Sequence, residues 1–80
     1  MQPTSLSRAS FGAAVAALRE QRGLSAAALA SATQLHPTLI QLIERGLTGV
    51  RLPTIISLAD ALGLSAGELL RVAERSDGAS

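Results

Sequence analysis

The side chains best suited to recognising another molecule fall within one short stretch of the chain. Thr38 and Gln41 are three residues apart and Leu42 follows, so on a helix all three share one face. A glutamine can bridge N6 and N7 of adenine, and a threonine methyl group or a leucine can pack on the methyl group of thymine. A merely solvated helix face is the alternative, but the apolar Leu42 argues against it. A helix face with these three residues is suited to DNA base contacts, although Leu42 is equally suited to contact with a protein.

Four positions around this stretch are candidates for contacts with DNA phosphates. Arg45 and Arg51 flank the turn that follows it. His36 lies at the expected start of the same helix, where it either contacts a phosphate or is simply an exposed helix cap. Ala26 opens another helix, whose N-terminal N–H groups attract anions without needing a side chain. Other arginines that could contribute are Arg8 and Arg22.

Residue types that serve catalysis or metal binding are scarce. The chain has no cysteine and a single histidine, which excludes disulfides, thiolate chemistry and a histidine-cluster metal site. Glu44 has no partner acid or base at a fixed spacing, so it does not form a general acid–base pair. We therefore expect no enzymatic activity, no metal site and no cofactor.

The composition is that of one small folded domain. Of the 80 residues, 48% are hydrophobic and 16% are charged, and the net charge is +1. A chain of this length buries roughly 60–65% of the surface that its unfolded form exposes, so its stability is marginal. No window is apolar enough to span a membrane, and no secretory pattern precedes the first expected helix. We expect a cytoplasmic protein that makes no contact with a membrane.

Capping and helix-breaking residues divide the chain into five short helices without strands, which predicts an all-α fold. The expected helices cover 10–23, 26–33, 37–45 and 52–62, with a last one that begins at 66. The start signals are Ser10, Ser25, Pro37, Pro53 and the Ser65–Glu68 capping box, and the stop signals are Gly23, Gly46 and Gly63. We expect a flexible leader over 1–9, a helix-turn-helix domain over 10–74 and a disordered tail over 75–80.

The most informative helices are the two joined by the turn Thr33–Leu35. The small Ala30 lies where the two helices must approach closely. Ile40 and Ile43 are three residues apart, so they anchor the second helix to the body and leave its opposite face free. A helix held in this way protrudes from the domain and can enter the major groove of DNA, which is the helix-turn-helix arrangement.

Five short motifs stand at fixed spacing between residues 18 and 70. They are Arg19…Arg22-Gly23-Leu24-Ser25, Leu29-Ala30, Ile43-Glu44-Arg45-Gly46, Leu58-Ala59…Ala61-Leu62-Gly63 and Glu68-Leu69-Leu70. In these motifs, and without a gap, the chain resembles the lambda-repressor-like, XRE-type helix-turn-helix family. The resemblance implies sequence-specific binding to double-stranded DNA, as a homodimer on a palindromic operator, with the helix over 37–45 in the major groove.

The resemblance also implies an ion pair between Arg19 and Glu44, which locks the first helix to the third. The chain departs from the family at Ala26, where glutamine is common, and over residues 47–50, where basic residues are common. Each phosphate contact that is missing lowers the dependence of affinity on salt. We therefore expect a shallower salt dependence than strongly basic repressors have.

Apolar residues in the last two expected helices exceed what a core of this size can bury. Because an exposed apolar patch usually marks an interface, Ile56, Leu69 and Val72 are predicted to form the homodimer interface. The alternative function is a protein-interaction module on the same fold, either antitoxin-like or a regulator-binding subunit. The apolar residues that favour this possible protein partner are Leu39, Leu42 and Leu47.

Overall fold

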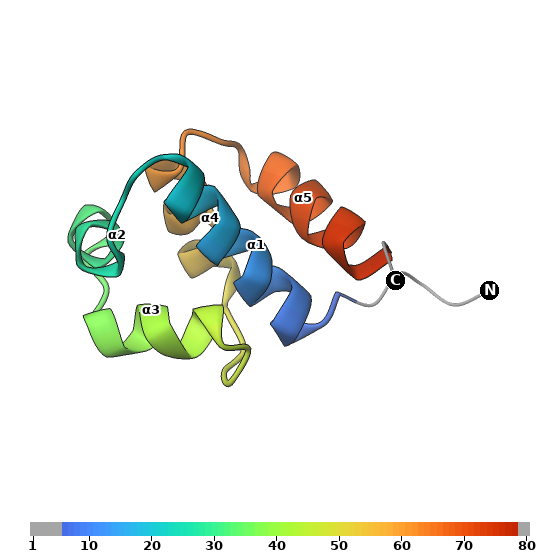
Figure 1. The fold of residues 1–80 in the computed structure, drawn as a ribbon, viewed down its shortest axis with the longest axis horizontal. Helices are drawn as coiled ribbons and strands as arrows, with labels where there is room; N and C mark the ends of the chain where they lie inside the picture. The colour runs from blue at the N-terminus through green and yellow to red at the C-terminus, as the bar shows by residue number, and fades with distance from the viewer. Residues whose placement is uncertain (1–5, 79–80) are drawn as a thin grey trace.

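The computed structural model describes residues 6–78, with side chains as far as Arg75, and over this range the chain forms five helices and no strand (Figure 1). In chain order the helices are α1 (Arg8–Gln21), α2 (Ala26–Thr33), α3 (Pro37–Glu44), α4 (Leu52–Ala61) and α5 (Ala66–Gly78). In Figure 1, α1 crosses the middle of the molecule, with α5 on one side and α2 and α3 on the other. The predicted all-α fold class is confirmed.

Helix starts follow the capping signals in the sequence. Ser25 Oγ accepts a hydrogen bond from the Ala28 N–H at 3.0 Å, which caps α2. At the start of α5, Ser65 and Glu68 form a reciprocal capping box, in which the Glu68 N–H donates to Ser65 Oγ and the Ser65 N–H donates to Glu68 Oε1. These bonds involve residues three apart, so the local sequence alone specifies them.

The first helix begins two residues earlier than the sequence predicted, and the last helix continues further. α1 begins at Arg8 because Ser7, and not Ser10, is its cap: Ser7 Oγ accepts a hydrogen bond from the Ser10 N–H at 2.9 Å. α5 continues to Gly78, so the prediction of a disordered tail from residue 75 is wrong over 75–78, where no proline interrupts the helix. The remaining residues of the predicted leader and tail, 1–5 and 79–80, lie outside the described residues.

The turn between α2 and α3 departs from the pattern of the other helix ends. After α3, the Gly46 N–H donates to the Ile43 carbonyl and the Leu47 N–H donates to the Leu42 carbonyl, with Gly46 in the left-handed region at φ 72°. α2 ends with the same hydrogen-bond pattern, but the left-handed residue is Gln34, at φ 59°. A side chain is disfavoured in this region, so the turn carries local strain that a glycine would relieve.

All five helices contribute to one hydrophobic core. Its largest fully buried side chains are Val15, Leu29, Ile40, Ile43, Leu58, Leu62 and Leu69. The prediction of Leu69 as an interface residue is wrong, because α5 packs along α1 and buries this side chain completely. Val72 is half-buried against the core, and Ile56 remains exposed.

α1 and α3 approach each other so closely at Gly12 that no side chain fits between them. A Cβ on Gly12 would lie 2.1 Å from the Ile43 carbonyl oxygen and 2.8 Å from the Glu44 carbonyl oxygen. The backbone of α1 therefore rests directly on the last turn of α3. This contact sets how deeply α3 is seated and how far its outer face stands out from the domain.

Candidate nucleic-acid interface

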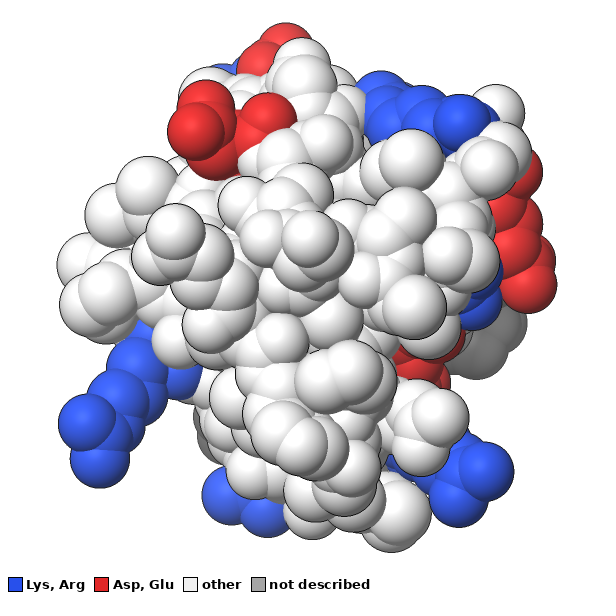
Figure 2. Space-filling view, turned by 90° about the vertical axis from the view of Figure 1, so that its left-hand side faces the viewer, with Lys and Arg blue, Asp and Glu red and all other residues white. Residues whose placement is uncertain are grey.

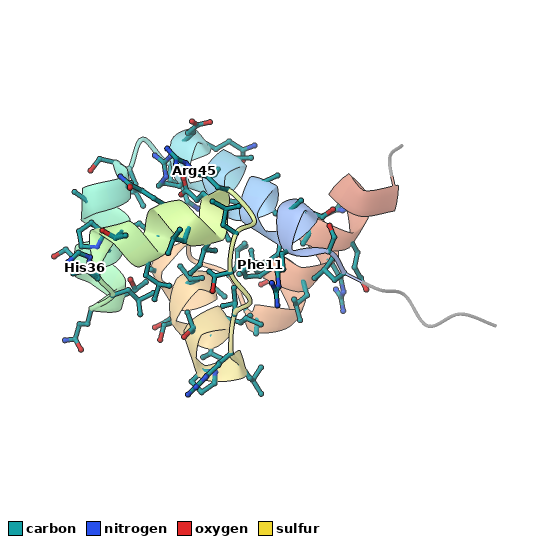
Figure 3. The ribbon with its side chains drawn as sticks, turned by 90° about the horizontal axis from the view of Figure 1, so that it is seen from below. Phe11, His36 and Arg45 are labelled. Carbon is teal, nitrogen blue, oxygen red and sulfur yellow. The ribbon has the colours of Figure 1, made fainter. Side chains whose placement is uncertain are left out.

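α3 has one face in the core and the other in solvent. Ile40 and Ile43 are buried on the inner face, whereas Thr38 and Gln41 are exposed on the outer face. Figure 3 shows α3 running across the underside of the molecule, with His36 near one end and Arg45 near the other. Of the three side chains predicted to contact bases, Thr38 and Gln41 are therefore accessible to a partner that approaches the outer face of α3.

Leu42, the third of these side chains, is half-buried, and it does not belong to the group of hydrophobic residues packed against the core. It adjoins Gln41 at the edge of the exposed face. Leu47, just beyond the end of α3, is 63% exposed. The outer face of α3 thus combines polar groups with an apolar border, which suits a partner that offers both hydrogen-bonding groups and methyl groups.

The starts of α3 and α2 present different groups to solvent. His36 caps α3, because its Nδ1 accepts a hydrogen bond from the Thr38 N–H at 3.1 Å. With Nδ1 accepting, the neutral ring carries its proton on Nε2, which can donate to a phosphate oxygen. Ala26 begins α2 and its side chain packs against the core, so its backbone N–H is the group suited to an anion.

Three arginines gather around the loop between α3 and α4. Arg45 is the C-cap of α3 and Arg51 is the N-cap of α4. The Arg8 guanidinium lies over the same loop, with a nitrogen 3.4 Å from the position of a Cβ on Gly49. In Figure 2, basic side chains lie along the lower edge, on the side of α3 in Figure 1, while the face toward the viewer is largely uncharged. Three of the seven arginines therefore lie around the loop that follows α3.

Arg22 does not join this group. Its Nε donates a hydrogen bond to the Leu62 carbonyl oxygen, and its Nη1 donates to the Leu18 carbonyl oxygen at 3.3 Å. The side chain therefore links the C-terminal ends of α1 and α4, where carbonyl groups lack helical partners and a cation is favoured. Its role is structural, and the suggestion that it contributes to phosphate binding is not supported by this position.

The N-terminus of α4 is a further feature suited to an anion, which was not predicted from the sequence. Its N-cap, Arg51, makes no side-chain capping hydrogen bond, and Pro53 has no N–H, so the N–H groups of Leu52 and Thr54 point out of an uncapped helix end. The positive end of the helix beside a guanidinium suits a phosphate. The signal in the sequence was arginine at a position where serine, threonine, aspartate or asparagine is usual. An adjoining groove of about 220 Å³ is lined by Leu39, Ile43, Gly49, Val50, Arg51 and Thr54.

Arg19 and Glu44 form the ion pair that the family resemblance implied. Arg19 Nε donates to Glu44 Oε2 at 2.7 Å and Nη2 donates to Oε1 at 3.1 Å, with both side chains largely buried. A third hydrogen bond runs from Arg19 Nη1 to the Leu24 carbonyl at 2.9 Å. The hydrogen bonds to Glu44 raise the pKa of Arg19 above its ordinary value. The pair fixes the end of α3 to α1, close to the contact at Gly12.

The described residues contain no cluster of side chains suited to a metal ion. Among them, no three histidine, cysteine, aspartate or glutamate side chains lie close enough together to hold a metal ion. Within the same part of the chain, every buried polar side-chain atom has a hydrogen-bond partner. No described helix has the length and apolar character needed to cross a membrane.

Comparison with known proteins identifies this arrangement. A family model described as "Helix-turn-helix domain" matches residues 10–72. No curated protein matches the sequence significantly.

Several solved structures match the fold over most of their length. The clp gene regulator ClgR from Corynebacterium glutamicum is 32% identical with a TM-score of 0.83, and the match covers 95% of this chain and 97% of that one. The restriction-modification controller protein C.AhdI from Aeromonas hydrophila is 35% identical with a TM-score of 0.75, covering 78% and 94%. The hypothetical transcription factor NHTF from Neisseria is 29% identical with a TM-score of 0.75, covering 88% and 86%. These similar proteins are regulators rather than enzymes.

Proposed function

The chain belongs to the helix-turn-helix domain family, with the lambda-repressor-like fold of XRE-type DNA-binding transcription regulators, and from this premise we propose that it binds a palindromic operator as a homodimer with α3 in the major groove. The observation that carries the proposal is the division of α3 into a buried face and an exposed one. Ile40 and Ile43 anchor the inner face of α3 in the core, so the exposed Thr38 and Gln41 are available for contacts with base edges. Leu42 borders them and is suited to a thymine methyl group.

Phosphate contacts are proposed on both sides of this reading face. At one end, the His36 ring and the Ala26 N–H lie at helix starts, where anions are favoured. At the other end are Arg45, Arg51 and the uncapped N-terminus of α4. Contacts of this kind orient a protein on the duplex without reading its sequence. With so few cations, we expect a shallow dependence of affinity on salt.

The homodimer is proposed to form through α4. Leu52 and Ile56 are 61% and 51% exposed and lie one helical turn apart, so they form an apolar strip on the surface of α4. Exposed apolar side chains grouped in this way favour an interface. Val72 packs partly against the core and is proposed to border the strip, whereas Leu69 is not part of it because it is buried. Two copies of α3 about 34 Å apart would read half-sites one turn of DNA apart.

Selection of binding sites from a randomised DNA pool, followed by fluorescence-polarisation titrations on the selected site, tests the reading face. The Gln41→Ala variant is expected to lose about 1–3 kcal/mol of binding free energy and to relax specificity at one base position. The matched control is Gln21→Ala, which removes an exposed glutamine at the end of α1 and is expected to bind as the wild type does. Equal affinities of the two variants for the selected site would exclude α3 as the reader.

The same titrations at several salt concentrations test the phosphate contacts. Arg51→Ala is expected to weaken all sequences alike and to reduce the slope of log K against log salt by about one. Arg71→Ala removes an exposed arginine from α5 and serves as the control. A salt slope that Arg51→Ala leaves unchanged would show that no phosphate lies against this side chain.

Analytical ultracentrifugation over a range of concentrations tests the homodimer. Ile56→Asp places a charge in the apolar strip and is expected to give monomers, whereas Ser57→Asp, on the neighbouring exposed position, is expected to leave the dimer intact. A wild-type protein that remains monomeric at high micromolar concentration would refute the dimer.

The second candidate function is a protein-interaction module on the same fold. The observation that favours it is the exposed Leu47 beside the half-buried Leu42, which gives the end of α3 an apolar surface. The polarisation titration on random duplex DNA separates the two functions. Salt-sensitive binding supports the DNA-binding regulator, and no binding at low salt supports the protein-interaction module.

A further inference from the structure

A small cavity, half open to solvent, lies where the start of α1 meets α4, α5 and the loop between α3 and α4. Its volume is about 150 Å³, and its lining residues are Leu6, Ser7, Arg8, Phe11, Val50, Ile55 and Leu70. Figure 3 shows Phe11 next to the connection between α3 and α4. From these residues we propose that the cavity is a binding site for a small apolar carboxylate, such as an aromatic or branched-chain acid of about the size of benzoate.

The size and lining of the cavity favour an apolar body for the ligand. Five of the seven lining residues are apolar, namely four aliphatic side chains from four parts of the fold and the Phe11 ring, and the other two are Ser7 and Arg8. An enclosed, engineered cavity of roughly 150 Å³ with walls of leucine, isoleucine and phenylalanine binds benzene. The cavity here has a similar volume but is half open to solvent, which leaves room for a polar group at the opening. One six-membered ring or a branched chain of similar bulk would therefore fill this space.

The charge at the cavity favours an anionic group on that ligand. Arg8 is the one charged residue that lines the cavity, and it has no ion-pair partner among the residues whose side chains the structure describes. Its guanidinium lies over Gly49, next to Val50 of the cavity wall, with two nitrogens 3.4 and 3.5 Å from the position of a Cβ on Gly49. A guanidinium at this place can bind a carboxylate through two parallel hydrogen bonds.

The occupied site would touch the part of the molecule that positions the arginines of the interface. Val50 belongs to the loop that joins Arg45, at the end of α3, to Arg51, at the start of α4. A bound carboxylate would therefore contact α1, this loop, α4 and α5 together. The inference does not depend on DNA binding, because the protein alone is sufficient to test it.

Titrations of the isotopically labelled protein with sodium benzoate, followed by amide correlation spectra, test the proposal. We expect saturable shifts confined to amides around the cavity, including those of Val50, Ile55 and Leu70. Benzamide has the same ring but no charge, and we expect it to shift the same amides with roughly tenfold lower affinity, because a hydrogen bond to a charged group is stronger than a neutral one.

The variants separate recognition of the charge from filling of the cavity. Arg8→Gln is expected to lower the affinity for benzoate roughly tenfold, to that of benzamide, while Arg71→Gln, a matched change on α5, leaves it unchanged. Val50→Phe fills the cavity from the loop and is expected to abolish the binding of both ligands. If Val50→Phe does not fold, the comparison of Arg8→Gln with Arg71→Gln still decides. The proposal is overturned by shifts scattered over the surface, by the absence of saturable shifts at millimolar benzoate, or by equal affinities of the wild type and Arg8→Gln for benzoate.

Discussion

Replacing Gly12 with alanine would place a methyl group in the contact between α1 and α3, where it would lie 2.1 Å from the Ile43 carbonyl oxygen. Non-bonded carbon and oxygen atoms rarely come closer than about 3 Å, so the two helices would have to separate by about 1 Å. A gap of that size removes between a quarter and a half of the dispersion energy of the atoms involved. Neither atom can rotate away, because the new Cβ and the carbonyl are both fixed by helical backbone.

The expected loss of stability follows from two opposing effects. Overpacking of a tight contact lowers the free energy of unfolding by about 3 kcal/mol at the upper end of the usual range. Alanine is the better helix former, which restores about 1 kcal/mol. Gly12→Ala is therefore expected to lower the free energy of unfolding by about 2 kcal/mol, and to lower the melting temperature by roughly 10 °C in a domain of this size.

Urea and thermal unfolding followed by circular dichroism measure this difference, with Gly67→Ala as the matched control. Gly67 lies in the first turn of α5, where a Cβ would meet nothing nearer than 3.9 Å. The same substitution there is expected to raise the free energy of unfolding by about 0.5 kcal/mol. If both variants shift stability in the same direction, or if Gly12→Ala is as stable as the wild type, the close contact between α1 and α3 does not hold the helices as described.

The remaining predictions concern the ion pair, the turn and the last helix. Arg19→Ala and Glu44→Ala are each expected to lower the free energy of unfolding by about 2–3 kcal/mol, because each leaves the charge of its partner poorly compensated. In a double-mutant cycle measured by thermal melts, the double variant is expected to lose less than the sum of the two single losses. Strictly additive losses would show that the two side chains do not interact. Gln34→Gly is expected to raise the free energy of unfolding by about 0.5–1 kcal/mol, because glycine adopts a positive φ without strain; an unchanged or lower melting temperature would contradict this. Glu68 accepts a hydrogen bond from the Ser65 N–H, which lowers its pKa, so its contribution to stability is present above about pH 4.3 and is lost as the pH falls through the lowered pKa. Urea melts should therefore show a wild-type advantage over Glu68→Gln at neutral pH that disappears in acid, and a constant difference across this range would refute the assignment.

Much of the architecture was predictable from the sequence because helix ends are local. Ser25 and the Ser65–Glu68 capping box act on N–H groups three residues away, and Gly46 ends α3 through hydrogen bonds that reach back only a few residues. Such signals operate within a single turn, so the order of the helices and the all-α class follow from them. The prediction failed where two local signals competed, as with Ser7 and Ser10 at the start of α1, since either serine can serve as a cap.

Which surplus apolar residues lie inside the molecule was decided only by the tertiary structure. Leu69 and Ile56 both have apolar neighbours at helical spacing, yet the first is fully buried and the second is half exposed. The periodicity of a helix defines an apolar face, but the rotation of that helix against its neighbours determines which residues at the edge of the face reach the core. The predicted interface consequently included one core residue.

The arrangement of the charges also required the three-dimensional structure. Arg8 and Arg22 are alike in the sequence, but the first lies over the loop that follows α3, while the second closes the ends of α1 and α4. The close approach at Gly12 brings the start of α1 to the end of α3, and this brings Arg8 to the same loop as Arg45 and Arg51. The sequence thus determined how many cations the protein has and that α3 carries polar residues on its outer face. The packing of α1 on α3 decided which of those cations lie next to the outer face of α3. Contacts between residues far apart in the chain leave no periodic signal in the sequence, so this arrangement could not be predicted from it.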